Sequence, residues 1–196
     1  NGMIDINWLR VNAPDDGSVQ IIDWTSALAG IGLWGPNSRS VLEKLCEDDD
    51  VSNEGFPFFS IKKISISNIP CVAVRISYIG ELGWEIYTPT EYGLSLWDEL
   101  KETSREFNMI CSGVGAFESL RLEKGYRSLG SDIHTNTNPY ESGLGFTVKL
   151  KKDDDFIGKE ALAKIKQQPI EKKLACMVLD DPEGMALGTE PIYSDG

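Results

Sequence analysis

Residues 61–87, IKKISISNIPCVAVRISYIGELGWEIY, carry the strongest strand pattern in the chain. Apolar residues recur on both sides of the turn-like tripeptide Asn68-Ile69-Pro70: Ile61, Ile64 and Ile66 before it, and Val72, Val74 and Ile76 after it. This pattern predicts two antiparallel strands joined by a turn. Further along, Gly80 and Gly83 lie between strand-like segments, which indicates a tight turn or a close approach of the backbone.

The segment before this stretch has the pattern of a strand followed by a helix. Residues 26–34 are mostly apolar and end at a Gly-Pro pair, which predicts a buried strand. Asn37 is placed to cap the helix that follows, whose apolar face carries Val41, Leu42 and Leu45.

Three further helices are predicted downstream. Residues 88–91, Thr-Pro-Thr-Glu, have the form of a capping box and predict a helix that begins there and runs through Leu96 and Leu100. The other two are predicted at residues 116–124 and 159–166. The order strand, helix, strand, strand, helix predicts an α+β fold of the ferredoxin-like type, a split βαβ sheet with helices on one face.

The chain of 196 residues is strongly acidic. Its 19 Lys and Arg against 31 Asp and Glu give a formal charge of −12, which argues against sequence-independent binding to nucleic acid or to an anionic membrane. No run reaches the roughly 18 consecutive apolar residues that a membrane-spanning helix needs. We therefore expect a soluble globular protein without nucleic acid or membrane partners.

Few residues offer nucleophilic or metal chemistry. The single histidine, His134, lies in a polar stretch and fits a solvated loop better than a catalytic role. The four cysteines are far apart and form no CxxC pair. A metal site usually needs several His or Cys ligands, and no glycine-rich phosphate-binding motif is present. The sequence therefore predicts no metal site.

Glu85 and Tyr87 are the most informative polar pair. In strand register they share one face, whereas Trp84 and Ile86 share the other. A carboxylate at such a position can accept two parallel N–H bonds from an amino-pyrimidine edge or a guanidinium. The residues alone leave two alternatives open, a ligand site and a structural hairpin.

Three motifs carry a resemblance to a known family. They are YIGELGWE at residues 78–85, GAFESLRLEKG at residues 115–125 and DFIGKEAL at residues 155–162. In sequence and order they resemble motifs of the aminomethyltransferase family, the folate-binding T-protein of glycine cleavage and its relatives. With GLWGP at residues 32–36, the chain is most similar to the carboxy-terminal folate-binding module of FAD-dependent dimethylglycine and sarcosine dehydrogenases.

This resemblance implies a tetrahydrofolate site. By analogy, Tyr78 and Glu85 match positions that hold the pterin end of the folate, and Tyr87 lies nearby. Phe146 matches an aromatic position that packs on the folate. From the residues alone, Tyr87 and Phe146 fit core aromatics in strands equally well.

Two departures from the T-protein pattern bear on this site. Phe117 stands where that branch has an arginine that meets the folate tail, so Arg121 or Arg127 is a candidate replacement. Arg121 alternatively pairs with Glu118 or Glu123 within a helix. The family's catalytic aspartate lies upstream of the segment that the first residues resemble, so we expect no catalytic residue in this chain.

The resemblance also implies how the chain is divided. Residues 1–24 are expected to be a remnant of an upstream folate-binding subdomain, residues 25–169 a ferredoxin-like folate-binding domain, and residues 170–196 the truncated start of a C-terminal β-barrel. Such a fragment is expected to be inactive alone and to work beside an upstream FAD domain of the same polypeptide. Its expected location is the cytoplasm, or the mitochondrial matrix in a eukaryote.

The implied function is one-carbon transfer, in which tetrahydrofolate N5 captures the iminium carbon that a flavin-dependent dehydrogenase makes from an N-methyl amino acid. Two alternatives stay open. One is a stand-alone aminomethyltransferase of the glycine cleavage system, and the other is a non-catalytic regulatory relative of the same fold.

Overall fold

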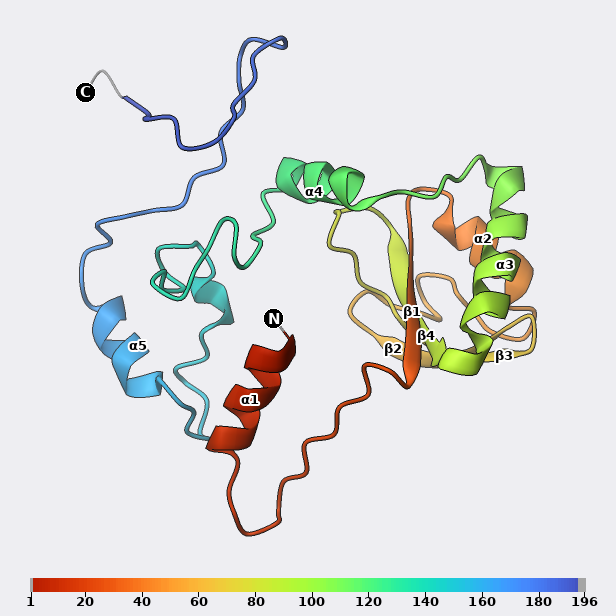
Figure 1. The fold of residues 1–196 in the computed structure, drawn as a ribbon, viewed down its shortest axis with the longest axis horizontal. Helices are drawn as coiled ribbons and strands as arrows, with labels where there is room; N and C mark the ends of the chain where they lie inside the picture. The colour runs from red at the N-terminus through yellow and green to blue at the C-terminus, as the bar shows by residue number, and fades with distance from the viewer. Residues whose placement is uncertain (1, 194–196) are drawn as a thin grey trace. The chain divides into compact units, whose positions relative to one another are not determined.

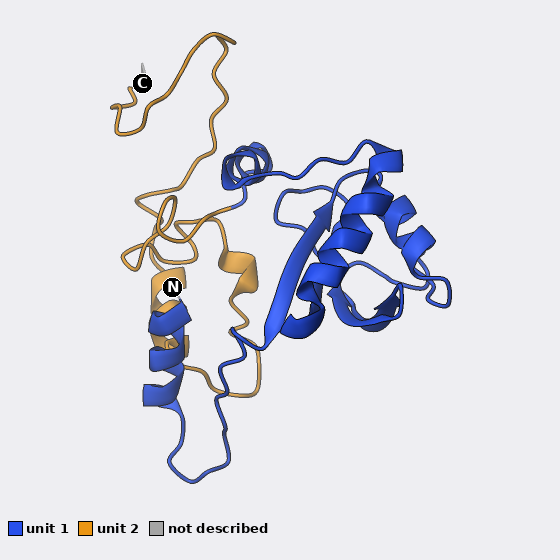
Figure 2. Ribbon diagram, turned by 45° about the vertical axis from the view of Figure 1, so that its right-hand side comes forward, with its two compact units in different colours: residues 1–126 blue, residues 127–196 orange. Residues whose placement is uncertain are grey.

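The computed structural model describes residues 2–193 and divides the chain into two compact units, residues 1–126 and 127–196 (Figure 2). The helices and strands of the first unit are α1 (Gly2–Asn12), β1 (Leu28–Trp34), α2 (Ser38–Leu45), β2 (Ile61–Ile66), β3 (Ile69–Val74), β4 (Gly83–Pro89), α3 (Gly93–Ser104) and α4 (Val114–Glu123). The second unit contains α5 (Lys159–Lys166). Short 3₁₀ turns lie at Thr90–Tyr92, Arg105–Phe107 and Gly145–Thr147.

The four strands form one antiparallel sheet in the order β1-β4-β3-β2. The predicted α+β class is confirmed. The order of the strands in the sheet, however, differs from the predicted split βαβ arrangement. In a split βαβ unit the two strands joined by the helix are parallel, with one strand between them. Here β1 and β2 are joined through α2 and lie at opposite edges, with β4 and β3 between them. The reason is that β4 continues the β2–β3 hairpin as a third strand and pairs with β1 along its whole length.

The β2–β3 hairpin is confirmed, with its turn one step earlier than predicted. Ser67 and Asn68 form the turn, and both have positive φ, 46° and 69°. A two-residue hairpin turn with both central residues at positive φ matches the right-handed twist of the strands. Pro70 therefore lies inside β3, opposite Ser65, and is not part of the turn.

Helices α2 and α3 pack against one face of the sheet (Figure 1). The core between them is built from the predicted apolar residues of α2 and α3 and from alternating strand residues: Leu33, Val41, Leu42, Leu45, Ile64, Ile66, Ile69, Cys71, Ala73, Trp84, Ile86, Leu96 and Leu100. The prediction of helices on one face is thus confirmed for this sheet. At roughly 1.5–3 kcal/mol for each fully buried aliphatic or aromatic side chain, this layer supplies the main stabilisation of the first unit.

Two local predictions in the first unit are wrong in part. The strand predicted at residues 26–34 is present as β1, but it is not a buried strand, because it lies at an edge of the sheet and only its Leu33 is buried. The helix predicted to begin in the box at residues 88–91 begins at Gly93 instead. Thr88 is 1% exposed and pairs with Ala29 in the sheet, and its hydroxyl donates to the Pro70 carbonyl at 2.9 Å. A buried strand residue in that position cannot cap a helix.

The second unit is built mostly from loops. Helix α5 has the bounds that the sequence predicts, and none of its residues is buried. The strand predicted near residues 174–179 is missing from the described residues 170–193, where the backbone of Leu174 donates to the Glu141 carbonyl at 2.9 Å and no strand partner is present. The structure therefore does not show the predicted start of a β-barrel. The domain boundaries at residues 24 and 169 stay predictions.

Candidate functional site

The face of the sheet away from α2 and α3, here called the outer face, carries the predicted polar pair. Glu85 and Tyr87 are half-buried there, while their strand neighbours Trp84 and Ile86 are in the core. This confirms the predicted alternation along β4. The Tyr87 hydroxyl donates a hydrogen bond of 2.6 Å to Glu85 Oε2.

In this hydrogen bond the proton belongs to the Tyr87 hydroxyl, and Glu85 is the acceptor. The pKa of Tyr87 is raised to about 12, first because its O–H donates to Glu85, then through burial and through the negative charge of Glu85. The phenol therefore stays protonated to higher pH than an ordinary tyrosine and acts as the donor to Glu85. Among the residues that the structure describes, none donates a hydrogen bond to the second carboxylate oxygen, Oε1. Glu85 thus offers acceptor capacity to a ligand.

Two glycines of β1 lie beside this pair in the neighbouring strand. Gly30 lies directly opposite Tyr87 and Gly32 directly opposite Glu85 in the β1–β4 register. A Cβ at Gly30 would lie 3.1 Å from Tyr87 Cε1, and a Cβ at Gly32 would overlap the ring of Trp34. The absence of side chains at both positions therefore lets two aromatic rings lie close to the backbone of the sheet.

Tyr78 belongs to an aromatic cluster between the β3–β4 connection and α4. Its ring stacks with Phe117 at 5.2 Å and with Tyr126 at 5.9 Å between ring centroids, at interplanar angles of 29° and 28°. Phe117 also packs on Trp34 at 6.0 Å, and Trp34 Nε1 donates to the Ile76 carbonyl at 3.1 Å. Phe117, the departure from the T-protein pattern, is therefore a structural partner of Tyr78.

A cavity of about 540 Å³ lies next to this cluster, at the β1 edge of the sheet. Apolar and aromatic residues line much of it, among them Trp34, Ile79 and Phe117, and Lys101 contributes a basic group to the lining. Glu85 and Tyr78 are not in its wall. The wall nevertheless includes Gly32, the cross-strand partner of Glu85. The cavity and the Glu85–Tyr87 pair therefore share strand β1 as a neighbour, although neither Glu85 nor Tyr87 lines the cavity.

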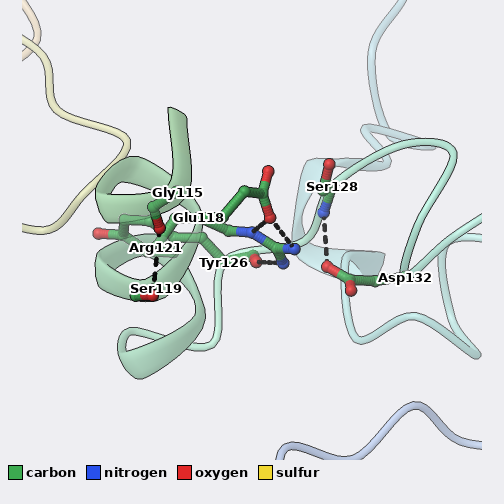
Figure 3. A network of polar contacts seen from close by, with 7 residues as sticks. All are labelled: Gly115, Glu118, Ser119, Arg121, Tyr126, Ser128 and Asp132. Atoms are coloured by element: carbon green, nitrogen blue, oxygen red, sulfur yellow. Dashed lines mark hydrogen bonds and ion pairs between the residues drawn. The ribbon is translucent and has the colours of Figure 1, made fainter. Parts of the chain in front are cut away.

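Arg121 is held inside the first unit by its own helix. It is 4% exposed, and its guanidinium binds Glu118 Oε2 through Nε at 2.9 Å and Nη2 at 2.5 Å (Figure 3). Its Nη1 donates to the Tyr126 carbonyl at 2.9 Å. This confirms the alternative of a structural pair within α4, with Glu118 and not Glu123 as the partner. A ligand carboxylate would have to compete with these contacts.

The remaining predicted residues belong to the second unit. Phe146 is 73% exposed in the 3₁₀ turn at Gly145–Thr147, so the alternative that it is a core aromatic in a strand is wrong. Arg127 is half-buried, and its Nε donates to the Ser142 carbonyl at 3.0 Å. His134 is exposed in a loop, as predicted. The roles of Phe146 and Arg127 toward a folate stay predictions.

Residues 1–152 match the protein family described as the GCVT N-terminal domain. The chain belongs to this family. Two curated relatives illustrate its range. Human mitochondrial dimethylglycine dehydrogenase is 39% identical over 193 residues, which are 98% of this chain and 22% of that protein. An aminomethyltransferase of Halothermothrix orenii is 36% identical over 170 residues, which are 87% of this chain and 46% of that protein.

A solved structure agrees with the family assignment. The glycine cleavage system aminomethyltransferase T of Bartonella henselae superposes with a TM-score of 0.69 at 26% identity, over 85% of this chain and 43% of that protein. This GCVT domain spans less than half the length of the relatives reported above. The activities of those whole proteins are therefore proposals for this chain.

Within the described residues of this GCVT domain, no group of three or more His, Cys, Asp or Glu side chains is placed to hold a metal ion. The helices in the described part of the chain are also too short or too polar to cross a bilayer.

Sequence reasoning missed several residues of this GCVT domain that the structure places beside Glu85 and Tyr87, in the cavity wall or against Gly80. Gly30 and Gly32 gave a usable signal, because glycines two apart in a strand mark a close approach to one face. Lys101 lies in the cavity wall, and the Lys124 side chain lies against Gly80. Neither lysine stands in a sequence pattern that could have predicted its position. Their position depends on how α3 and α4 pack against segments distant in sequence.

Proposed function

We propose that this chain is a folate-dependent aminomethyltransferase-like domain that binds tetrahydrofolate on the outer face of its sheet. The observation that carries the proposal is the Glu85 carboxylate, held by Tyr87 with acceptor capacity left for a ligand. The family match and the enzymatic relatives support it. They also favour a chain that works as part of an enzyme.

The residues on the outer face suit the pterin end of a folate. An ionised carboxylate accepts two parallel N–H bonds from an amino-pyrimidine edge, and such charge-assisted pairs are both directional and strong. Tyr78 has ring faces already engaged by Phe117 and Tyr126. We therefore assign to Tyr78 an edge or hydroxyl contact with the ligand, and not stacking on its ring face.

In the finer form of the proposal, the chain is the folate module of a flavin-dependent dimethylglycine or sarcosine dehydrogenase. Bound tetrahydrofolate would supply N5 as the nucleophile for the one-carbon unit of an oxidised N-methyl amine. The residues of this chain would orient the pterin through Glu85 and shield it from water, so that capture exceeds release of formaldehyde. No described residue is assigned to proton transfer.

The tail of a folate is anionic, and the chain has a charge of −12, so the tail needs a local cation. Arg121 is engaged by Glu118 and is a poor candidate for this role. In the first unit, Lys101 in the cavity wall and the exposed Lys124 are better placed. Arg127 and Phe146 of the second unit remain proposed contacts.

The test is titration calorimetry of tetrahydrofolate, under anaerobic conditions, into this chain and into a longer polypeptide that includes the upstream region. Replacement of Glu85 by Gln removes the charge and should weaken binding about 10- to 100-fold, because a hydrogen bond to a charged group contributes about 1.5–3 kcal/mol. The control is Glu91→Gln, an exposed glutamate outside the site. Equal affinity of Glu85→Gln and parent would refute the site. No binding to either protein would favour the regulatory alternative.

The finer role is tested on the holoenzyme with a flavin domain. There Glu85→Gln should leave amine oxidation unchanged while the product shifts from methylenetetrahydrofolate to free formaldehyde. A parent polypeptide without any flavin-binding region, but with aminomethyl transfer from a lipoyl carrier, would instead establish the glycine cleavage alternative. The proposed location follows the same choice: the cytoplasm, or the mitochondrial matrix of a eukaryote, which agrees with the mitochondrial human relative.

A further inference from the structure

Two half-buried arginines lie together at the edge of the core, on the side of the sheet that α2 and α3 cover. Arg39 belongs to α2 and Arg75 directly follows β3. Both guanidinium groups lie over the ring of Trp84, at 5.3 Å and 5.8 Å from its centroid. Trp84 is a core residue and does not face the outer side of the sheet. The arginine pair is therefore separate from Glu85 and from the folate site proposed above.

The two guanidinium groups share one neutral acceptor. Arg39 Nη2 donates to Asn53 Oδ1 at 2.8 Å, and Arg75 Nη2 donates to the same oxygen at 2.7 Å. The two Nη2 atoms are thus no farther apart than the sum of these distances. Asn53 is an exposed residue of the loop between α2 and β2. Displacement of this single side chain would open the point between the two Nη2 atoms to a ligand from solvent.

The other acceptors of the pair are also uncharged. Arg39 Nη1 donates to the Val51 carbonyl, and Arg75 Nη1 donates to the Phe56 carbonyl at 2.6 Å. Within residues 2–193, no carboxylate forms an ion pair with either arginine. This lack of a carboxylate is unexpected in a chain that has 31 Asp and Glu against 19 Lys and Arg.

Hydrogen-bond donors also outnumber acceptors around the pair. Arg75 Nε and Trp84 Nε1 are buried and have no hydrogen-bond partner among the residues that the structure describes. Burial and the positive charge of Arg39 lower the pKa of Arg75. Charges removed from water are normally paired with an opposite charge, and two adjacent like charges repel each other. The arginine pair therefore lacks a negatively charged acceptor.

We propose that Arg39 and Arg75 form an anion-binding site, in which a phosphoryl group takes the place of the Asn53 amide oxygen. Guanidinium groups bind phosphate through parallel N–H bonds, and a phosphate dianion matches the two positive charges. One phosphate oxygen would lie between the two Nη2 atoms, where Asn53 Oδ1 lies now. This inference goes beyond the proposed function and does not depend on it.

The first test is urea denaturation of this chain with sodium phosphate at about pH 8, where phosphate is mainly a dianion, with ionic strength held constant by sodium chloride. Phosphate bound to the folded state should raise the unfolding midpoint in a saturable manner. Arg39→Gln and Arg75→Gln should each weaken the apparent phosphate affinity about 10- to 100-fold. The control is Arg105→Gln, which removes an exposed arginine that pairs with Glu102 and should leave the affinity unchanged.

Two outcomes of this test would overturn the site. One is the absence of a saturable rise in the parent, and the other is an equal rise in the parent and in both pair variants. Acetate, with a single charge, should give a weaker apparent affinity than phosphate. Equal affinities for acetate and phosphate would refute the choice of a dianion.

Asn53 provides a test that leaves both arginines in place. Asn53→Asp puts a carboxylate at the shared acceptor position, so it should raise the urea midpoint without phosphate and abolish the further rise with phosphate. Asn53→Ala removes the competing acceptor and should bind phosphate at least as tightly as the parent. Asn136→Asp, in an exposed loop of the second unit, is the control for the added charge. A phosphate-dependent rise that persists in Asn53→Asp would refute the position assigned to the anion.

A cleft beside Arg75 allows free phosphate and a phosphate ester to be distinguished. The cleft has a volume of about 310 Å³, and its lining includes Arg75, Phe58, Ser77 and Glu81. Phe58 offers an aromatic surface, and Glu81 disfavours a second anionic group. If the site holds an ester with a neutral body, phenyl phosphate should bind about 2- to 10-fold more tightly than inorganic phosphate, and Phe58→Ala should abolish this gain. Equal affinities in the parent would identify free phosphate as the ligand.

Discussion

The two faces of the same sheet differ in what their residues do. On the face covered by α2 and α3, Trp84 and Ile86 of β4 are fully buried in a continuous apolar core. On the outer face, Glu85 and Tyr87 of the same strand are half-buried and hydrogen-bonded to each other, and both lie opposite glycines of β1. Neighbouring residues of one strand therefore serve stability and the proposed ligand binding separately, because successive side chains of a strand point to opposite faces.

This separation has a physical consequence. Substitutions on the covered face should lower the free energy of unfolding, and conservative substitutions on the outer face should alter binding with little loss of stability.

The largest effect is expected for Trp84→Ala. Trp84 is 0% exposed, and its ring contacts Phe56 and lies beneath the guanidinium groups of Arg39 and Arg75. Its removal should lower the free energy of unfolding by about 3–5 kcal/mol, measured by urea denaturation. Its strand neighbour provides the control, since Glu85→Ala should cost about 1 kcal/mol or less. Similar losses of unfolding free energy for the two variants would contradict the proposed difference between the two faces.

Gly32→Ala should give the next largest effect, because a Cβ there would overlap the Trp34 ring. We expect a loss of about 1–3 kcal/mol, typical of overpacking, together with a change in tryptophan fluorescence as the ring moves. The matched control is Gly115→Ala in α4, which should stabilise by about 0.5–1 kcal/mol because alanine favours helix. If Gly32→Ala is as stable as the parent, the outer face has more room than the structure indicates.

Arg121→Met tests whether a buried charged residue contributes to stability, as the residues of the covered face do, and not to ligand binding. Arg121 donates to Glu118 and to the Tyr126 carbonyl, and Glu118 keeps access to water, with 45% of its side chain exposed. The loss should therefore be about 1–2 kcal/mol of unfolding free energy, with tetrahydrofolate affinity unchanged. A large loss of affinity at unchanged stability would instead make Arg121 a contact for the folate tail.

The smallest effect concerns pH. The pKa of Tyr87 is raised to about 12 in the folded chain, against about 10 when unfolded. Because the folded pKa is the higher one, the stability that the Tyr87–Glu85 bond contributes is fully present below about pH 10 and is lost as the pH rises toward about 12. Denaturation at about pH 9 and about pH 11.5 should therefore show a smaller decline for Tyr87→Phe than for the parent. Equal declines would indicate that the bond contributes nothing to folding.

Local patterns predicted much of the fold. The alternation along β4 placed Glu85 and Tyr87 on one face. Apolar spacing identified α2 and α3, and the Gly and Pro residues that end helices identified α4 and α5. The capping box at residues 88–91 failed because burial and strand pairing of Thr88 outweighed a local preference. Such a preference contributes only about 1 kcal/mol.

The amino-acid sequence was sufficient to predict the class of fold, the family resemblance and the alternation along β4 that separates the two faces. The tertiary structure was needed to show that β4 lies between β1 and β3 and that Gly30 and Gly32 lie beside Tyr87 and Glu85. The physical reason is the range of the interactions. Periodicity and caps act between residues a few positions apart, whereas the β1–β4 pairing joins segments far apart in the chain, and no local pattern encodes which strand becomes the neighbour.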